Sequence, residues 1–193
     1  VKIGVAYPGI DNRYYSNKRD LHAKNILAIG NVIERKGYHV LIEALADIKS
    51  DWHLNIIGKF SSDDPYYQSL VEKIHKFKLS NNIRFLGNIS EVNKMKIMLN
   101  SKIFVLPTFY EGFGISLVEA TALGLNIITS DLPVLREVLK GGGTQFIPIN
   151  NTKKLSAAIE NTILHTSRLT NNKIKNYSWR SAAKIFKREL HAN

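Results

Sequence analysis

The chain is built from short apolar, β-branched runs that alternate with longer stretches in which apolar residues recur at helical spacing. The apolar runs predict strands over 26–30, 52–58, 82–87, 103–106, 125–130 and 144–149. The intervening stretches predict helices over 38–48, 66–77, 90–99, 133–140 and 152–163, a helix between Ile115 and Gly124, and a last helix after Trp179, with Thr152 suited to cap the helix that carries Leu155. Elements that alternate in this way form a parallel sheet with helices on both faces, and such α/β domains bind ligands outside the carboxyl ends of the strands.

The length of 193 residues suits one such domain and is short for two. We expect the domain to span 26–193. Residues 1–25 contain a Pro-Gly turn followed by polar and charged residues, a composition typical of an interdomain linker or an N-terminal extension. The sequence has no cysteine, which excludes disulfides and thiolate metal sites. No apolar run approaches the roughly 20 residues that a membrane-spanning helix needs.

Residues 102–124 carry the most informative pattern. The strand predicted over 103–106 is ended by Pro107, and a helix begins at Ile115. The turn between them, 111–114, reads Glu-Gly-Phe-Gly. A glycine turn that leads into a helix start places unpaired backbone N–H groups and the positive end of the helix dipole at one spot. This arrangement suits a phosphate group, which the glycines allow to approach the backbone closely.

Two carboxylates frame this turn. Glu111 stands at the exit of the strand, where it either contacts a ligand or complements the helix dipole and caps N–H groups. Glu119 lies one turn beyond Ser116 among apolar neighbours, so it either faces solvent or holds a partner. The spacing alone leaves both alternatives open.

The whole pattern resembles the signature of retaining glycosyltransferases of family 4. The matching features are Glu111 and Glu119 with seven residues between them, Gly-Phe-Gly after the first, and Ala120 and Gly124 after the second. The resemblance extends over essentially the whole chain. It implies the C-terminal, donor-binding domain of a two-domain GT-B enzyme, with a Rossmann-like fold. It also implies that an N-terminal domain, the usual site of the acceptor, is missing here.

The loop 30–37 resembles the Gly-Arg…Lys-Gly loop of this family, whose basic residues contact the donor diphosphate. Lys36 matches the lysine of that loop, whereas Asn31 stands where many members have arginine. Arg35 is therefore the candidate substitute for the second cation. Without the resemblance, Lys36 and Arg35 would be taken for solvated loop charges, which are the norm.

The resemblance also implies roles for the two carboxylates. Glu111 would hold hydroxyls of the donor sugar, and Glu119 would hold the ribose hydroxyls of the nucleotide. A carboxylate suits this task because it can accept hydrogen bonds from two vicinal hydroxyls. Ile89 would pack on the nucleotide base, although it could equally belong to the core, and Lys94 would reach the donor.

The mechanism that follows is electrostatic. The leaving group is a nucleoside diphosphate, so catalysis needs cations and N–H dipoles where negative charge grows as the glycosidic bond breaks. Lys36 and Glu111 are the predicted catalytic residues, and Glu111 is not assigned as a nucleophile. No metal or other cofactor is expected. The predicted donor-binding residues are Asn31, Arg35, Lys36, Ile89, Lys94, Glu111, Gly112, Phe113, Gly114, Ser116, Leu117, Val118 and Glu119.

The net charge of +11 raises other classes of partner. A nucleic-acid footprint gathers basic residues on one face, but here they are spread along the chain in clusters no denser than Lys18-Arg19 or Lys153-Lys154. A basic nucleic-acid-binding module, or a non-catalytic nucleotide-binding module of the same fold, is therefore the lesser alternative. A dehydrogenase is disfavoured because no G-x-G-x-x-G follows the first strand.

The resemblance favours a cytoplasmic enzyme, with peripheral contact to the inner face of the membrane, that transfers a hexose such as mannose or glucose to a glycan, lipid or other acceptor.

Overall fold

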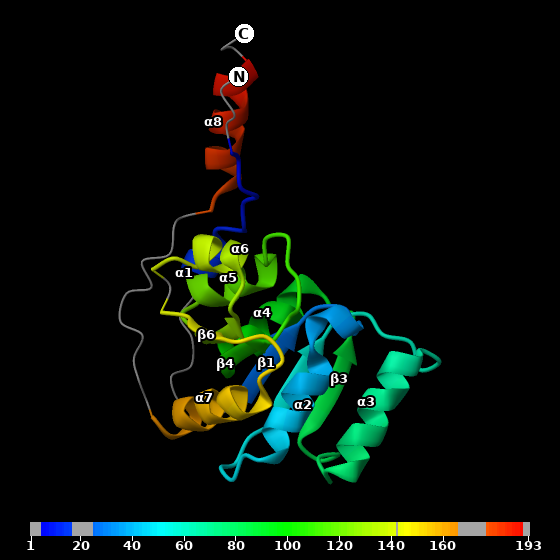
Figure 1. Cartoon of the computed structure of the whole chain (residues 1–193). Helices are drawn as coiled ribbons and strands as arrows, with labels where there is room; N and C mark the ends of the chain where they lie inside the picture. The colour runs from blue at the N-terminus through cyan, green and yellow to red at the C-terminus, as the bar shows by residue number, and fades with distance from the viewer. Residues whose placement is uncertain (1–4, 17–24, 142, 166–176, 191–193) are drawn as a thin grey trace.

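The computed structural model describes residues 5–16, 25–141, 143–165 and 177–190, and its strands and helices alternate as the sequence predicts (Figure 1). The strands are β1 (Asn25–Ile29), β2 (Leu54–Ile57), β3 (Ile83–Gly87), β4 (Ser101–Leu106), β5 (Asn126–Ser130) and β6 (Gln145–Ile147). The helices are α1 (Arg13–Ser16), α2 (Tyr38–Ala46), α3 (Pro65–Lys76), α4 (Glu91–Leu99), α5 (Ile115–Ala122), α6 (Pro133–Val138), α7 (Thr152–Leu164) and α8 (Trp179–Leu190). A short 3₁₀ helix, η1 (Glu34–Lys36), precedes α2.

The strands pair in parallel in the order β3-β2-β1-β4-β5-β6. The chain moves outward from β1 to β3, returns to place β4 beside β1, and then continues in the opposite direction to β6. Ile26 and Leu27 of β1 lie opposite Ile103 and Phe104 of β4. The strand order therefore reverses between β1 and β4, and in open α/β sheets the crevice for a ligand lies at such a reversal.

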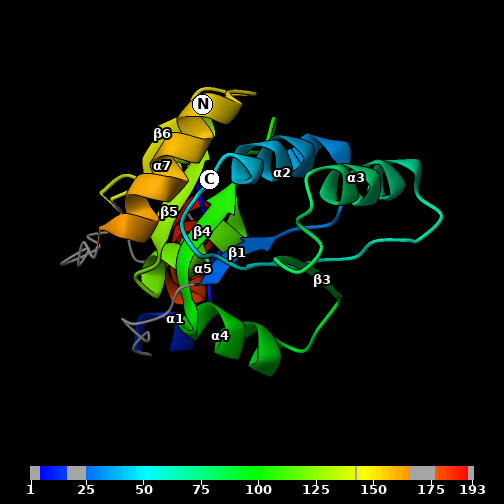
Figure 2. The same cartoon turned by 90° about the horizontal axis from the view of Figure 1, so that it is seen from below.

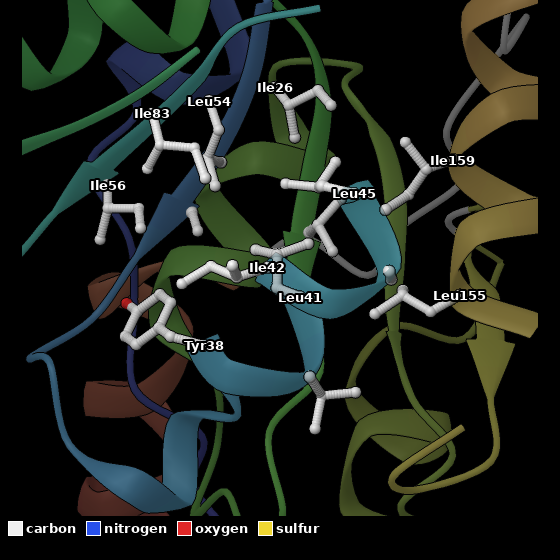
Figure 3. Close-up of a cluster of buried hydrophobic side chains, with 14 of the residues drawn as sticks. Ile26, Tyr38, Leu41, Ile42, Leu45, Leu54, Ile56, Ile83, Leu155 and Ile159 are labelled. Atoms are coloured by element: carbon white, nitrogen blue, oxygen red, sulfur yellow. The ribbon is translucent and has the colours of Figure 1, made fainter. Parts of the chain in front are cut away.

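Helices cover both faces of this sheet (Figures 1 and 2). The face beneath α2, α3 and α7 forms a first core, in which α2 and α7 pack side by side over the strands (Figure 3). Members labelled in Figure 3 are Ile26, Tyr38, Leu41, Ile42, Leu45, Leu54, Ile56, Ile83, Leu155 and Ile159. The face beneath α1, α4, α5 and α6 forms a second core, whose members include Ile10, Tyr14, Leu27, Met98, Phe104, Leu106, Leu117, Val118, Ile127, Leu135, Val138 and Tyr177. Because both faces are buried, the central strands read as continuous apolar runs.

Two local features differ from what the sequence predicts. α1 lies within the predicted linker 1–25, and Ile10 and Tyr14 are buried in the second core. Residues 1–4 and 17–24 of that linker lie outside the described residues, and the end of the linker stays a prediction. α7 is capped by Asn151, whose side-chain oxygen accepts a hydrogen bond from the amide three residues on, so the expected cap, Thr152, is already the first helical residue.

The loops that follow β1 and β4 are held against each other by backbone contacts. Gly37 has a left-handed φ of 71°, and a Cβ atom built on it would lie 2.1 Å from the carbonyl oxygen of Pro107. The Phe109 amide donates to the Arg35 carbonyl at 2.7 Å, and the Thr108 hydroxyl donates to the same carbonyl at 2.9 Å. These contacts fix the loop after β1 at one position beside the loop after β4.

α8 extends away from the sheet (Figure 1). It carries two large apolar side chains, Trp179 and Phe186, which are 63% and 66% exposed. Its basic side chains include Arg180, Lys184, Lys187 and Arg188. The helix therefore has both apolar and basic surface that the rest of the described chain leaves accessible.

Gly37→Ala is expected to lower the free energy of unfolding by about 1–3 kcal/mol, because the added methyl group meets the Pro107 carbonyl at a positive φ. Gly112→Ala is the matched control, since no heavy atom of the described residues lies within 4 Å of a Cβ atom at Gly112. That variant should change the free energy of unfolding by less than about 0.5 kcal/mol. Urea unfolding followed by circular dichroism measures both variants, and equal effects would contradict the close contact between the two loops.

Candidate functional site

A cleft of about 410 Å³ opens at the carboxyl edge of the sheet, where the strand order reverses. Its walls come from the end of β1, from η1, from α4, from the loop after β4 and from the first turns of α5. The lining residues are Ile29, Gly30, Lys36, Lys94, Glu111, Phe113, Gly114, Ile115, Ser116 and Glu119. The cleft therefore joins the two segments that carry most of the predicted donor-binding residues, the loop 30–37 and the motif that begins at Glu111.

The start of α5 forms one wall of the cleft. Gly114 precedes the helix with a left-handed φ of 79°, and its carbonyl oxygen accepts hydrogen bonds from the amides of Leu117 at 2.9 Å and Val118 at 3.1 Å. The first amides of a helix have no partner within the helix, and no acceptor among the described residues is recorded for those of Ile115 and Ser116. These two amides and the positive end of the helix dipole are therefore open to an anion.

Lys36 and Glu111 form an ion pair in the cleft. Lys36 is the last residue of η1, and the side chains of Lys36 and Glu111 are only 11% and 9% exposed. The stem of Lys36 passes close to Gly30, where a Cβ atom would lie 3.1 Å from the lysine Cε. Each charge thus has a partner in a largely buried position, which is the condition for keeping it there.

Lys94 and Glu119 form a second ion pair, in which Lys94 Nζ lies 3.2 Å and 3.1 Å from the two carboxylate oxygens. Glu119 belongs to α5 and is 7% exposed. Lys94 belongs to α4 and also lies 3.0 Å from the carboxylate of Glu91. The sequence leaves open whether Glu119 faces solvent or holds a partner, and the structure shows that it holds Lys94.

Burial raises the pKa of Glu119 above its ordinary value, although the charge of Lys94 opposes the shift. Burial works against the ammonium form of Lys94, but the hydrogen bond with Tyr14 and the charges of Glu119 and Glu91 outweigh it and raise the pKa of Lys94. The raised pKa of Lys94 favours its ammonium form, and the charge of Lys94 in turn favours the ionised form of Glu119. On acidification, Glu119 loses its charge at a higher pH than an ordinary glutamate.

Arg35 and Asn31 are exposed and do not line the cleft. Arg35 Nη1 donates to the carbonyl oxygen of Tyr110 at 3.1 Å, and the side-chain oxygen of Asn31 accepts from the Lys59 amide at 3.3 Å. Both side chains thus take part in contacts between loops. Their predicted contacts with the donor stay predictions.

Four other predicted residues also lie outside the lining of the cleft. Ile89 is half-buried and packs against the second core, as the alternative interpretation of this residue has it. Leu117 and Val118 are fully buried, and Gly112 is exposed in the turn. The predicted residues that the structure does bring together in the cleft are Lys36, Lys94, Glu111, Phe113, Gly114, Ser116 and Glu119.

Ile29, Gly30 and Ile115 line the cleft although they are not among the site residues predicted from the sequence. Ile115 is the first residue of α5 and is 48% exposed. Its position directly after the glycine turn is the sequence feature that could have predicted it as a lining residue. The partner of each lysine leaves no such signal, because the paired residues are 75 and 25 positions apart in the chain.

Within the described ranges, no group of three or more His, Cys, Asp or Glu side chains is placed to hold a metal ion. The helices in that part of the chain all fall short of the length and apolarity that crossing a membrane requires.

A parallel sheet whose strand order reverses beside a glycine turn and a helix start defines a class of α/β domains that bind phosphate-bearing ligands. Comparison with known families defines the chain further. Residues 15–180 match the family described as glycosyl transferases group 1. The chain belongs to this family, which confirms the family resemblance read from its sequence.

Curated relatives support the assignment. The chain is 30% identical over 172 residues to the phosphatidyl-myo-inositol mannosyltransferase of Mycobacterium tuberculosis, an alignment that covers 81% of this chain and 44% of the relative. It is 31% identical over 162 residues to the O-antigen chain mannosyltransferase RfbU of Salmonella typhimurium, covering 83% of this chain and 44% of the relative. The chain thus spans less than half the length of these relatives.

Solved structures share the fold. Anabaena Alr3699/HepE, in a crystal structure with UDP and glucose, superposes with a TM-score of 0.82 and 18% identity, over 97% of this chain and 56% of that one. Sucrose-phosphate synthase from Thermosynechococcus elongatus superposes with a TM-score of 0.78 and 20% identity, over 98% of this chain and 52% of that one. The predicted α/β, Rossmann-like parallel sheet of a GT-B glycosyltransferase domain is confirmed.

Lys94→Met is expected to lower the free energy of unfolding by about 3 kcal/mol near pH 7, because it leaves the buried carboxylate of Glu119 without its partner. Burial raises the pKa of Glu119 above its unfolded value, and the charge of Lys94 opposes this shift, so removal of Lys94 raises the pKa further. The contribution of Glu119 to the free energy of unfolding is therefore favourable at low pH and is lost as the pH rises through the folded pKa. The loss caused by Lys94→Met should therefore be smaller near pH 5 than near pH 7, as urea unfolding at both values can measure.

Lys96→Met is the control for this experiment. Lys96 lies on the same helix and is exposed, so its replacement should change the free energy of unfolding by less than about 0.5 kcal/mol at either pH. A loss for Lys94→Met that does not depend on pH would contradict the pairing of Lys94 with a buried, charged Glu119.

Proposed function

We propose that this chain is the donor-binding domain of a retaining glycosyltransferase that uses a nucleoside-diphosphate sugar. The observation that carries the proposal is the presence of two lysine–glutamate pairs in one cleft beside the start of α5. A nucleoside-diphosphate sugar has an anionic diphosphate between two sets of hydroxyl groups, one on the ribose and one on the sugar. Ammonium groups and helix amides suit the diphosphate, and carboxylates suit the hydroxyls.

The diphosphate is placed at the start of α5 in this proposal. The amides of Ile115 and Ser116 would donate to phosphate oxygens at the positive end of the helix dipole. Lys36 would contact the phosphates as well, because an ammonium group has three donors and Glu111 occupies only part of them. As the glycosidic bond breaks, these groups would stabilise the charge that grows on the leaving diphosphate. No metal ion is required by this arrangement.

The two carboxylates would hold the two ends of the ligand. Glu111 would accept hydrogen bonds from hydroxyls of the sugar, near the bond that breaks, and Glu119 would accept them from the ribose. Lys94 supports this role because its charge favours the ionised form of Glu119. Lys36 and Glu111 are thus the groups nearest the reacting bond, and Glu119 contributes to binding of the nucleotide.

The whole enzyme would need a second domain for its acceptor. The resemblance to GT-B enzymes and the 44% coverage of the mannosyltransferase relatives support this part of the proposal. α8, with Trp179 and Phe186 exposed, would pack on that domain. The names of the relatives support transfer of a hexose to a lipid or glycan acceptor, and a lipid acceptor would bring the enzyme to the cytoplasmic face of a membrane.

Titration calorimetry of the chain with UDP, GDP and ADP is expected to find one of these nucleotides that binds. Lys36→Met and Glu119→Gln should each weaken that binding by roughly 10- to 100-fold, because each removes a hydrogen bond to a charged group, worth about 1.5–3 kcal/mol. The calorimetric dissociation constants measure both effects and name the base.

Lys49→Met is the matched control, because Lys49 is exposed beyond the far end of α2 and should leave the affinity unchanged. If no nucleotide bound while a DNA or RNA duplex did, with an affinity that falls steeply as salt rises, the donor-site proposal would be wrong and the basic surface would be the functional feature.

The chain on its own is expected to transfer sugar far more slowly than about 1 per second, a typical enzyme rate, because one side of the cleft, where the acceptor binds, belongs to another domain in this proposal. Release of nucleoside diphosphate from the matching sugar nucleotide, measured with and without glycan or lipid acceptors, tests this expectation. Transfer at about 1 per second or faster would show that the described domain is sufficient for catalysis.

A further inference from the structure

Tyr14 connects the short helix α1 to the donor cleft. The residue is only 2% exposed, and its ring lies against Lys94, with the ammonium nitrogen 5.4 Å from the ring centroid. Its hydroxyl donates to the carboxylate of Glu91 at 3.2 Å, and Glu91 in turn pairs with Lys94. Since Lys94 also pairs with Glu119, the four side chains form one network that runs from α1 through α4 to α5.

Only the inner half of this network reaches the cleft. Lys94 and Glu119 line it, whereas Tyr14 and Glu91 do not. Glu91 is also the most open member, with a side chain that is 64% exposed, while the side chains of Lys94 and Glu119 are 13% and 9% exposed. Tyr14 therefore forms the buried outer support of Lys94, and solvent covers much of Glu91.

Lys94 needs such a support to hold one position. A lysine ammonium is a strongly hydrated charge on a flexible four-carbon stem, and one of the two carboxylates that pair with Lys94, that of Glu91, is itself largely exposed, so the ion pairs alone do not restrain it well. An aromatic ring beneath the ammonium adds an attraction of about 0.5–2 kcal/mol and blocks other rotamers by its volume. The hydroxyl of Tyr14 adds a hydrogen bond in the same place, which contributes to the charged state of Lys94.

We infer that Tyr14 is a positioning residue for the donor site, which holds Lys94 and, through it, the carboxylate of Glu119 in the orientation that binds the ribose. This inference rests on the proposed function, in which Glu119 contacts the nucleotide. α1 also packs directly on α5, the helix that carries Glu119. The segment before the first strand, for which the sequence predicts only a linker, thereby contributes to nucleotide binding.

Tyr15 provides a matched control on the same helix. It is half-buried, and its hydroxyl accepts a hydrogen bond from the amide of Tyr177 at 2.9 Å. Tyr15→Phe and Tyr14→Phe each remove one hydroxyl group from α1. Only Tyr14→Phe removes it from the network that reaches Glu119.

The test compares both variants with the unmodified chain in two measurements. The first is the affinity for UDP, GDP and ADP by calorimetry, and the second is a ¹³C NMR titration of the Glu119 carboxyl carbon without ligand. Tyr14→Phe should weaken binding of the preferred nucleotide by roughly 3- to 10-fold. It should also raise the pKa of Glu119, because the Tyr14 hydroxyl lowers that pKa and the facing groups Lys94 and Glu91 remain. Tyr15→Phe should leave both quantities unchanged, even if it lowers the melting temperature to the same extent.

Wild-type affinity together with an unchanged Glu119 titration in Tyr14→Phe would overturn the inference, and so would equal effects of the two substitutions. A failure of the proposed function would look different, because the unmodified chain would then bind none of the three nucleotides. In that event the NMR titration decides whether Tyr14 positions the Lys94–Glu119 pair.

Discussion

The site depends on the pairing of two buried carboxylates with two lysines from other parts of the chain. The side chains of Glu111 and Glu119 are each 9% exposed. A carboxylate at that depth without a partner would take up a proton or destabilise the fold. Lys36 and Lys94 supply the opposite charges from η1 and α4, so the cleft exists as a charged site only if the fold brings these four segments together.

The reversal of strand order between β1 and β4 brings them together. η1 follows β1 and Glu111 follows β4, and the two strands are neighbours in the sheet. Glycines allow the backbones to meet at this edge: a Cβ atom at Gly58 would lie 2.1 Å from the carbonyl oxygen of Gly30, and one at Gly37 would lie equally close to Pro107. Backbone packing thus sets where the ammonium of Lys36 can lie, and the start of α5 sets where an anion can bind.

The sequence predicts the layers well and marks two of the segments that line the cleft, because both predictions rest on local patterns. Strands and helices are encoded by apolar periodicity, and the Glu-Gly-Phe-Gly turn between β4 and α5 predicts a helix start that suits an anion without reference to the rest of the chain. The strand order and the partners of Lys36 and Lys94 are not encoded locally, since they depend on contacts between distant segments. The packing of Tyr14 also cannot be predicted from the sequence, because α1 has only four residues and therefore no helical periodicity.

In the proposed function, a diphosphate binds at the start of α5, between the two ion pairs. Titration of ¹⁵N-labelled protein with the nucleoside diphosphate that binds, followed amide by amide, tests it most directly. If the diphosphate binds there, the amides of Ile115 and Ser116, together with those of Gly30 and Lys36, shift and saturate along one binding curve. Shifts confined to α8 and other basic surfaces outside the cleft, if inorganic polyphosphate caused the same shifts, would contradict this placement of the diphosphate. They would show that the nucleotide binds by non-specific electrostatic attraction.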